Sequence, residues 1–290
     1  CEEDVSTARD PSRLFEQDHG WVFEVKPTAR PALARPEPIR PMGRFYHEAV
    51  AVDPASGIVY MTEDRGDGLI YRYVPKERER LLAGGRLQAM AARAFRQSGL
   101  DTRNWGDRGR IPIGRAHEAE WIDLDEILAP KDDLRERGAA KGAAVFARGE
   151  GMWYGGSPGA IYWACTEGGR EKLGQIWRYT PSPHEGTDDE RSSPGRFELF
   201  IEPDDARVLR NADNITFAPP PRGDIIVCED CDGENRLLGV TPGGEVYTLA
   251  RNAKDRSEFA GATFSPDGST LFVNIQEPGS TLAVRGPWRG

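Results

Sequence analysis

Carboxylate side chains recur at the ends of short apolar segments in this sequence. The segment "IVCEDCDGEN" places Glu229 and Asp230 after a β-branched run, and "GIVYMTED" places Glu63 and Asp64 in the same way. The segment "AIYWACTEGG" continues into Glu167, and the chain itself opens with "CEED". Carboxylate oxygens are the ligands that hard cations such as Ca²⁺ prefer, in sets of about 6 to 8. The repetition therefore predicts that several strands contribute oxygen ligands to one cation site.

The elements that would position these carboxylates are short strands with period-two alternation, separated by turn residues. One unit, over residues 47–75, contains "HEAVAVDP", "GIVYMTED" and "GLIYRYVP"; similar units follow over residues 150–203, 213–252 and 258–288. Antiparallel units of roughly 40 to 50 residues are typical of a β-propeller. We therefore predict an all-β fold with a single β-propeller domain over residues 1–290. About four and a half blades are recognisable in the sequence.

Each unit opens on a polar pair; the four pairs are His47-Glu48, Gly149-Glu150, Asp213-Asn214 and Ser257-Glu258. The first strand of a propeller blade lines the central channel, so these side chains are expected to converge on the axis. Glu63, Glu167 and Glu229 should lie about one strand further out. A single glutamate at such a position also fits a hydrogen bond to a neighbouring blade. Several carboxylates in one channel would repel one another, so their shared register favours a metal site.

Two parts of the chain depart from the repeat. The opening "CEED" aligns with "CTEGG" and "CEDC", so we expect the sequence to begin in the middle of a blade, with "GWVFEVKP" as the next strand. Residues 76–147 are interpreted as an insertion between blades that covers one mouth of the channel. Within it, "RERLLAGGRLQAMAARAFRQSG" favours a helix, and the following segment favours a strand and then a helix. Residues 181–195 are expected to form a polar excursion.

The composition of the chain limits the kinds of molecule that it is expected to bind. The 290 residues include 33 Gly and 22 Pro and carry a formal net charge of −9, which suits a loop-rich β protein. The acidic balance argues against nucleic acid as a partner, and no apolar run approaches the ~18 to 20 residues of a membrane span. A cation or a small molecule bound through cations fits this charge better.

Several motifs, in order along nearly the whole chain, resemble one family. They include "GRFYHEAVAVDP", "ARGEGMWY", "YWACTEGG", "DNITFAP", "VCEDC" and "EFAGATFSPDGSTLFVNIQEPG". These segments look like the PhoX-type alkaline phosphatase family of bacterial propeller phosphatases. The resemblance implies a six-bladed propeller in the complete protein, and a periplasmic or secreted location. It also implies hydrolysis of small phosphate monoesters at an axial cluster of Ca²⁺ and Fe³⁺. We expect the protein to be a monomer.

The resemblance also implies roles for individual residues. Arg148, two residues before Glu150, matches the family's phosphate-binding arginine, and the two are the expected catalytic residues. The metal-site candidates are Glu3 in "CEE", Glu48 in "HEA", Glu150 in "RGEG", Asp213 and Asn214 in "DNI", and Glu258 in "EFAGA". A further cysteine ligand in the family lies in a segment upstream of Cys1, so we expect this chain to be truncated at its N-terminus. Loss of that ligand could leave the truncated chain inactive.

Three functions are compatible with the sequence. The first is a metal-dependent phosphatase, in which clustered cations polarise a phosphate ester and Arg148 binds its oxygens. The second is a Ca²⁺-dependent lactonase-like hydrolase, which has less need for Arg148 beside the metal. The third is a noncatalytic propeller that binds Ca²⁺ for stability, since fold alone does not determine function.

Overall fold

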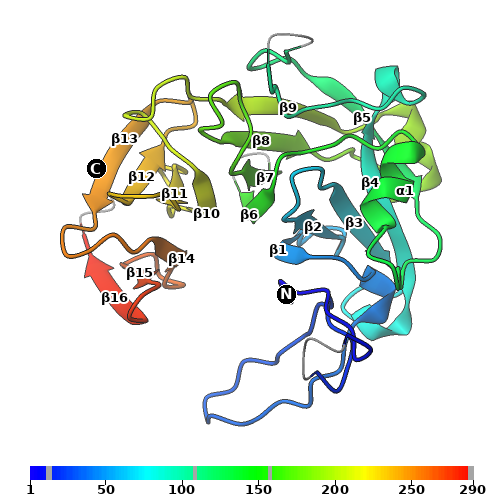
Figure 1. Ribbon diagram of the computed structural model, residues 1–290, viewed down its shortest axis with the longest axis horizontal. Helices are drawn as coiled ribbons and strands as arrows, with labels where there is room; N and C mark the ends of the chain where they lie inside the picture. Colours follow the sequence, from blue (N-terminus) through cyan, green and yellow to red (C-terminus); the bar gives the residue numbers. More distant parts are fainter. Residues whose placement is uncertain (11–14, 107–109, 156–158, 287–290) are drawn as a thin grey trace.

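The computed structural model describes residues 1–10, 15–106, 110–155 and 159–286. Strands dominate this part of the chain, and they are arranged as antiparallel sheets around a common centre (Figure 1). The predicted all-β, propeller-like fold is therefore confirmed. Residues 107–109 of the predicted insertion and residues 287 and 288 of the fourth predicted unit lie outside the described residues.

The first two blades are four-stranded and share the same order of strands. The first contains β1 (His47–Val52), β2 (Val59–Glu63), β3 (Ile70–Pro75) and β4 (Gly85–Ala92). The second contains β6 (Gly149–Gly155), β7 (Ala160–Cys165), β8 (Gln175–Thr180) and β9 (Arg196–Ile201). The alternation read from the sequence had located seven of these eight strands.

A further strand, β5 (His117–Asp123), joins these two blades at their outer edges. It pairs antiparallel with β4, where Met90 lies opposite Trp121, and with β9, where His117 lies opposite Phe197. The result is one nine-stranded sheet in the order β1-β2-β3-β4-β5-β9-β8-β7-β6. Backbone hydrogen bonds, and not only side-chain packing, therefore hold the first two blades together.

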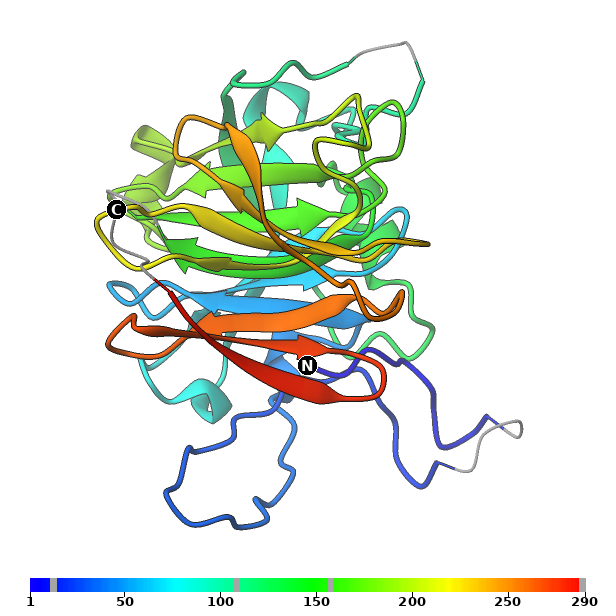
Figure 2. The same ribbon diagram turned by 90° about the vertical axis from the view of Figure 1, so that its left-hand side faces the viewer.

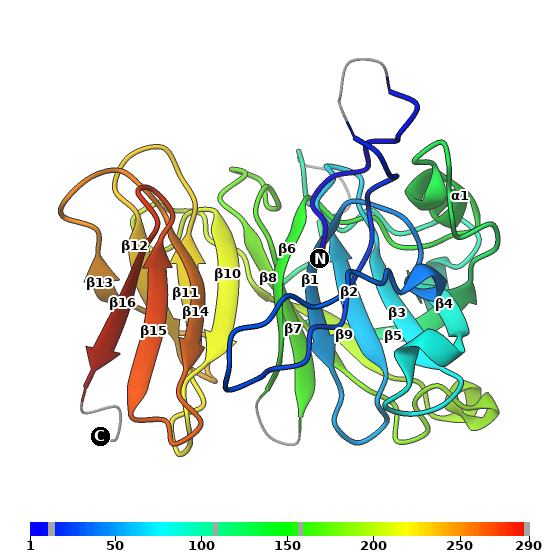
Figure 3. The same ribbon diagram turned by 90° about the horizontal axis from the view of Figure 1, so that it is seen from below.

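The other blades form separate sheets. The third contains β10 (Ala212–Phe217), β11 (Ile225–Glu229), β12 (Arg236–Val240) and β13 (Val246–Arg251), and the fourth contains β14 (Phe259–Phe264), β15 (Thr270–Ile275) and β16 (Ser280–Arg285). Figure 3 shows both sheets set apart from the nine-stranded sheet. The innermost strands β1, β6, β10 and β14 contact one another in that order, so they lie around the centre seen in Figure 1.

An aromatic cluster in the second blade fixes the start of β6. Phe146 is fully buried, and its ring packs edge-on against Trp163 at 5.6 Å and Trp177 at 5.5 Å between ring centroids. Such edge-to-face pairs are favourable beyond the area that they bury. Because Phe146 lies just before Arg148 and Glu150, this packing sets the position from which those two side chains emerge.

The helix predicted within "RERLLAGGRLQAMAARAFRQSG" was wrong. Residues Gly85–Ala92 form strand β4, flanked by the short 3-10 helices η2 (Leu81–Ala83) and η3 (Arg93–Phe95). The alanines favour a helix in isolation, but β4 is hydrogen-bonded on both sides, to β3 and β5, and its last six residues are buried. Tertiary pairing has overridden local propensity here. The strand and helix predicted after it are confirmed as β5 and α1 (Leu134–Ala140).

The N-terminal region differs from the predicted half-blade. Within residues 1–10 and 15–39 no strand forms, and the predicted strand "GWVFEVKP" contributes only an isolated bridge between Phe23 and Pro38. Val22 and Ile39 instead pack with Met42 and Phe45, beside the 3-10 helix η1 (Arg40–Met42), against side chains of β2 and β3. Figure 2 shows the N-terminal loops extending away from the strands. None of the helices in the described part of the chain has the length and apolar character that a membrane crossing requires.

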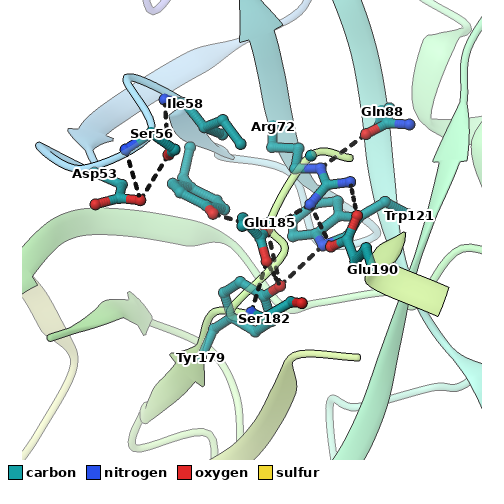
Figure 4. A network of polar contacts seen from close by, with 12 residues as sticks. Asp53, Ser56, Ile58, Arg72, Gln88, Trp121, Tyr179, Ser182, Glu185 and Glu190 are labelled. Carbon is teal, nitrogen blue, oxygen red and sulfur yellow. Dashed lines mark hydrogen bonds and ion pairs between the residues drawn. The ribbon is translucent and has the colours of Figure 1, made fainter. Parts of the chain in front are cut away.

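The segment of residues 181–195 is not simply a polar excursion. It carries Glu185 and, on the 3-10 helix η4 (Asp188–Ser192), Glu190, and both carboxylates form ion pairs with Arg72 of β3 (Figure 4). The side chain of Arg72 is 2% exposed, and Gln88 of β4 accepts a further hydrogen bond from its Nε at 2.8 Å. The segment therefore attaches the second blade to the first through a buried charged network.

Candidate functional site

β-Bulges mark the start of three inner strands, at the places where the sequence pattern had located polar residues. The pairing register shifts between His47 and Val50 in β1, between Gly149 and Met152 in β6, and between Ala212 and Ile215 in β10. The residues inside these shifts include Glu48, Glu150, Asp213 and Asn214. A bulge redirects the side chains of the extra residue, and bulges are common beside active sites. Each bulge here turns a carboxylate out of the regular pleat.

Three carboxylates from the first two blades form one compact group. Glu48 of β1, Asp64 after β2 and Glu150 of β6 each have an oxygen within 4.8 Å of the others. The hydroxyl of Thr62 links the two blades here, since Thr62 Oγ1 donates to the Glu150 carbonyl at 2.7 Å and accepts from Ala49 N at 3.0 Å. The spacing of this group is thus held by both blades.

A second group comes from the third blade and the approach to the fourth. Asp213 of β10, Asp230 after β11 and Glu258 before β14 each have an oxygen within 4.8 Å of the others. The two groups adjoin, because the charge of Asp213 raises the pKa of Glu150 and a hydrogen bond with Glu150 acts on the pKa of Asp213. We call these six carboxylates, Glu48, Asp64, Glu150, Asp213, Asp230 and Glu258, the axial cluster.

Burial and crowding of negative charge raise the pKa values of several carboxylates of the axial cluster. Burial and the neighbouring carboxylates Glu3, Asp213 and Asp64 raise the pKa of Glu48 to about 8. The pKa values of Glu150 and Glu258 are raised by the same two causes, burial and then neighbouring carboxylates. Desolvation and like charges both disfavour the ionised form, whereas a bound cation would favour it. In the absence of cations these carboxylates therefore stay protonated at pH values well above those at which carboxyl groups usually ionise.

Arg148 is the cation that faces the first group. Its Nε lies 2.6 Å from Asp64 Oδ1, and its Nη2 lies 3.0 Å from Asp64 Oδ2 and 2.8 Å from Glu150 Oε1. Its backbone is in the left-handed region, with φ of 53°, which is uncommon for a residue other than glycine. The Arg148 N–H donates to Arg65 O at 2.9 Å, and the Arg148 carbonyl accepts from Thr166 N at 3.0 Å. Both neighbouring loops thus hold the strained backbone in place.

The paired carboxylates after the second strands have two different roles. In the first blade, Glu63 is buried and accepts from Leu69 N at 3.1 Å and Tyr71 Oη at 2.8 Å. In the third blade, Glu229 is likewise buried, and it forms an ion pair with Arg236 at 2.6 Å. The first carboxylate of each pair therefore fixes the turn within its own blade. The second carboxylate, Asp64 or Asp230, faces the axial cluster.

Sequence reasoning missed Asp64 and Asp230 as site residues. The signal was present, since both follow an apolar strand directly after a glutamate, in "TED" and "CED". Because alternate positions along a strand point to opposite sides, only one member of each pair can face the axis, and the pattern does not show which one.

The structure does not bring all of the sequence-predicted residues into the axial cluster. Glu48, Glu150, Asp213 and Glu258 belong to it, and Arg148 contacts it. Glu3 is exposed and lies outside both groups, although its charge contributes to the raised pKa values of Glu48 and Glu258. Asn214 is half-buried beside Asp213. Their metal-binding roles stay predictions.

The axial cluster opens into a polar cavity of about 680 Å³. Its walls come from the second, third and fourth blades and include Arg148, Thr166, Glu167, Asp230, Arg256 and Glu258. A cavity of this size accommodates a small molecule. Arg148 and two members of the cluster are therefore accessible from one space.

The donor set of the axial cluster fits hard cations. All six side chains offer carboxylate oxygens, the ligands of Ca²⁺. Burial and then neighbouring negative charge raise the pKa values of Glu48, Glu150 and Glu258, and a bound cation would offset both effects. Arg148 supplies one positive charge to the first group, and no cysteine belongs to either group among the described residues. Residues from four blades could thus hold two or more cations next to Arg148.

Comparisons with known proteins were consistent with this architecture. Residues 6–279 match the family described as alkaline phosphatase PhoX, whereas no curated protein matches the sequence. Among solved structures, Pseudomonas fluorescens PhoX in complex with vanadate, a transition state analogue, matches with a TM-score of 0.66 and 23% identity. The match covers 89% of this chain and 53% of that chain, so this chain spans about half the length of that PhoX.

A second structural match is much weaker. A proposed 6-phosphogluconolactonase from Bacteroides uniformis has a TM-score of 0.35 and 14% identity, over 81% of this chain and 69% of that chain. At 23% identity, the likeness to Pseudomonas fluorescens PhoX shows the fold alone.

Proposed function

The chain belongs to the PhoX alkaline phosphatase family, and from this membership we propose that it hydrolyses phosphate monoesters at the axial cluster. The observation that carries the proposal is that Arg148, which contacts the first carboxylate group, lines one cavity together with Asp230 and Glu258 of the second group. A phosphate monoester is a dianion, so a site of bare carboxylates would repel it. Cations and an arginine at the same place reverse that charge.

The proposed roles of the residues follow from their chemistry. The six carboxylates of the axial cluster would hold the cations, and Asn214 and Glu3 are candidates for additional oxygen ligands. Bound cations would supply polarisation of the phosphoryl oxygens and activation of an oxygen nucleophile. Ca²⁺ is the cation that the carboxylate set favours. Fe³⁺ is included because the resemblance to the family implies it.

Arg148 is proposed to bind the phosphoryl group. Asp64 and Glu150 occupy its Nε and Nη2, and among the described residues its Nη1 makes no hydrogen bond. The two carboxylates hold the guanidinium plane in one orientation, and the cavity reaches the same residue. A preorganised donor of this kind stabilises charge that develops on the phosphoryl oxygens, because the enzyme does not have to reorient it during the reaction.

The direct test is hydrolysis of p-nitrophenyl phosphate by the protein, before and after removal of metal with a chelator. We expect activity that chelation abolishes and that added Ca²⁺, alone or with Fe³⁺, restores. Glu150→Gln should lose this activity, because the substitution removes a charge from the cluster but keeps the shape of the side chain. Glu118→Gln is a matched control, since Glu118 lies exposed on β5 outside the cluster.

Two other results would assign a different function. Bound Ca²⁺ without hydrolysis of any phosphate ester would indicate a noncatalytic propeller. Hydrolysis of lactones in place of phosphate esters would indicate the lactonase-like alternative. Both measurements use the same purified protein, so the three functions are separated in one series.

We further propose that the protein is a monomer that acts in the periplasm or outside the cell. The support for this location is the resemblance to the family. Fractionation of the native cells with an antibody tests the location, and light scattering during size-exclusion chromatography tests the monomer. A cytoplasmic signal or a dimer mass would contradict the respective proposal.

A further inference from the structure

Thr166 has a buried hydroxyl that the protein itself does not use. The residue follows strand β7 and is 3% exposed, and its Oγ1 has no hydrogen-bond partner among the described residues. Thr166 also lines the 680 Å³ cavity that contains Arg148. An unpartnered buried hydroxyl is costly, so a native example in the wall of a cavity calls for a ligand.

The backbone of Thr166 is fixed on both sides. Its N–H donates to the Arg148 carbonyl at 3.0 Å, and its own carbonyl accepts from Asn211 Nδ2 at 3.0 Å. Arg148 and Asn211 both have positive φ values, 53° and 48° respectively. Two strained residues from neighbouring segments thus hold the main chain of Thr166, so its hydroxyl is presented from a rigid support.

The repeat places Thr166 at a position that faces the centre. Thr166 follows Cys165, which pairs with Gly149 as Glu63 pairs with His47 and Glu229 with Ala212. Thr166 therefore occupies the position that Asp64 takes in the first blade and Asp230 in the third, directly after the second strand. Both of those aspartates belong to the axial cluster. The second blade thus has a neutral hydroxyl where the other two have a carboxylate of the cluster.

We propose that Thr166 Oγ1 donates a hydrogen bond to a non-bridging oxygen of the bound phosphoryl group, beside Arg148. The inference rests on the proposed phosphatase function and extends it to a further substrate-binding residue. Arg148 would bind the anion through a charged group and Thr166 through a neutral one, and the backbone hydrogen bond between the two residues keeps them adjacent. Hydrogen bonds to charged groups are stronger than neutral pairs, so the effect on binding should be measurable.

The test compares Thr166→Val with Thr166→Ser in the Ca²⁺-loaded protein. Valine keeps the shape and removes the hydroxyl, whereas serine keeps the hydroxyl. We expect Thr166→Val to weaken binding of inorganic phosphate, measured by calorimetry, and to lower kcat/KM for p-nitrophenyl phosphate, each by about 10- to 100-fold. Thr166→Ser should stay within about threefold of the parent protein, and Ca²⁺ content should be unchanged in both variants.

Thermal unfolding separates this role from a structural one. Because Thr166 Oγ1 has no partner, Thr166→Val should leave Tm unchanged or raise it. Thr62→Val is the matched contrast, since Thr62 Oγ1 bonds to Ala49 and Glu150, and its Tm should fall. A folded Thr166→Val that binds phosphate as tightly as the parent would overturn the inference. So would a loss of Tm in Thr166→Val that Thr166→Ser restores, because the hydroxyl would then be structural.

The outcomes also separate this inference from the proposed function. A parent protein that binds phosphate but hydrolyses no ester would contradict the phosphatase proposal, and the difference in phosphate affinity would still decide the role of Thr166. A Ca²⁺-loaded parent that binds no phosphate would contradict both.

Discussion

Arg148 Nε lies 2.6 Å from Asp64 Oδ1, so a guanidinium from the second blade closes on a carboxylate from the first. The contact crosses between two blades, and the same guanidinium also reaches Glu150. Arg148 thus has two possible roles, as a structural counter-ion of the carboxylates and as a ligand for an anion in the cavity. These roles make different predictions for substitution.

Arg148→Lys should lower kcat/KM for a phosphomonoester by roughly 10²- to 10³-fold, the usual effect of losing one preorganised donor to the transition state. Lysine keeps the charge but lacks the planar fork that now spans Asp64 and, among the described residues, leaves Nη1 without a hydrogen bond. Kinetics and metal analysis on the same samples are the measurement. Loss of bound metal in the variant would show instead that Arg148 organises the carboxylates, and equal activity would exclude the substrate role.

Removal of metal should lower the Tm of the protein. A cation that binds only the folded state stabilises it by about 2.7 kcal/mol when its concentration is 100 times Kd. Differential scanning calorimetry with Ca²⁺ and with excess chelator is the measurement. An unchanged Tm would argue that the axial cluster holds no cation.

The stability of the metal-free protein should fall as pH rises. The pKa of Glu48 is raised from its ordinary value of 4.5 to about 8, so its contribution is fully present below pH 4.5 and is lost as pH passes through 8. The raised pKa of Glu258 acts in the same direction. Tm measured from pH 5 to pH 9 should therefore decline in chelator. With saturating Ca²⁺ the decline should disappear, since cations favour the ionised carboxylates; parallel profiles would contradict this explanation.

Adjacent carboxylates should behave differently on neutralisation. Glu229→Gln breaks the ion pair with Arg236 at a position that is 0% exposed, and we expect a loss of about 3 kcal/mol in the free energy of unfolding. Asp230→Asn removes a charge that faces the axial cluster, so it should weaken Ca²⁺ binding with little effect on the metal-free Tm. Chemical denaturation and Ca²⁺ titration distinguish the two. The reverse assignment of effects would mean that the roles within the pair are exchanged.

The network around Arg72 should be required for stability. Arg72→Met leaves Glu185 buried without its cation, and breaking a buried pair in this way typically costs about 3 to 5 kcal/mol. Urea denaturation of the variant is the measurement. Arg78→Met is the control, because Arg78 is exposed and should change stability by less than about 0.5 kcal/mol. Equal stabilities would mean that the segment of residues 181–195 is attached by other contacts.

The sequence predicted the repeating strands well because each buries alternate residues in a regular pattern. It failed at β4, where an alanine-rich segment gains its strand conformation from partners on both sides, β3 and β5. It also failed at residues 20–27, where the predicted strand has no neighbour to pair with along its length. Propensity and periodicity describe a segment alone, whereas these two outcomes depend on what lies beside it.

In the candidate site, too, the sequence predicted what depends on a local pattern and missed what depends on neighbouring segments. Glu48, Glu150, Asp213 and Glu258 were found because their register repeats from unit to unit. The contact of Asp64 with Arg148 and the unpartnered hydroxyl of Thr166 were not predicted, because they depend on bulges and on the distance between blades. The local sequence pattern predicts which residues of one strand face the centre. It does not predict how closely two strands from different blades approach each other.

Strand β5 joins the first two blades into one cooperative unit, whereas the third and fourth blades are separate sheets. Because it pairs with both β4 and β9, neither of the first two blades can open at that edge without breaking backbone hydrogen bonds to β5. The first carboxylate group, with Arg148, lies wholly within this unit. The second group comes from two smaller sheets that share no strand pairing with this unit. A cation shared by both groups would thus serve as a non-covalent crosslink between units that otherwise open independently. When it binds, amide hydrogen exchange in β10 and β14 would slow toward the rate in β1 to β9.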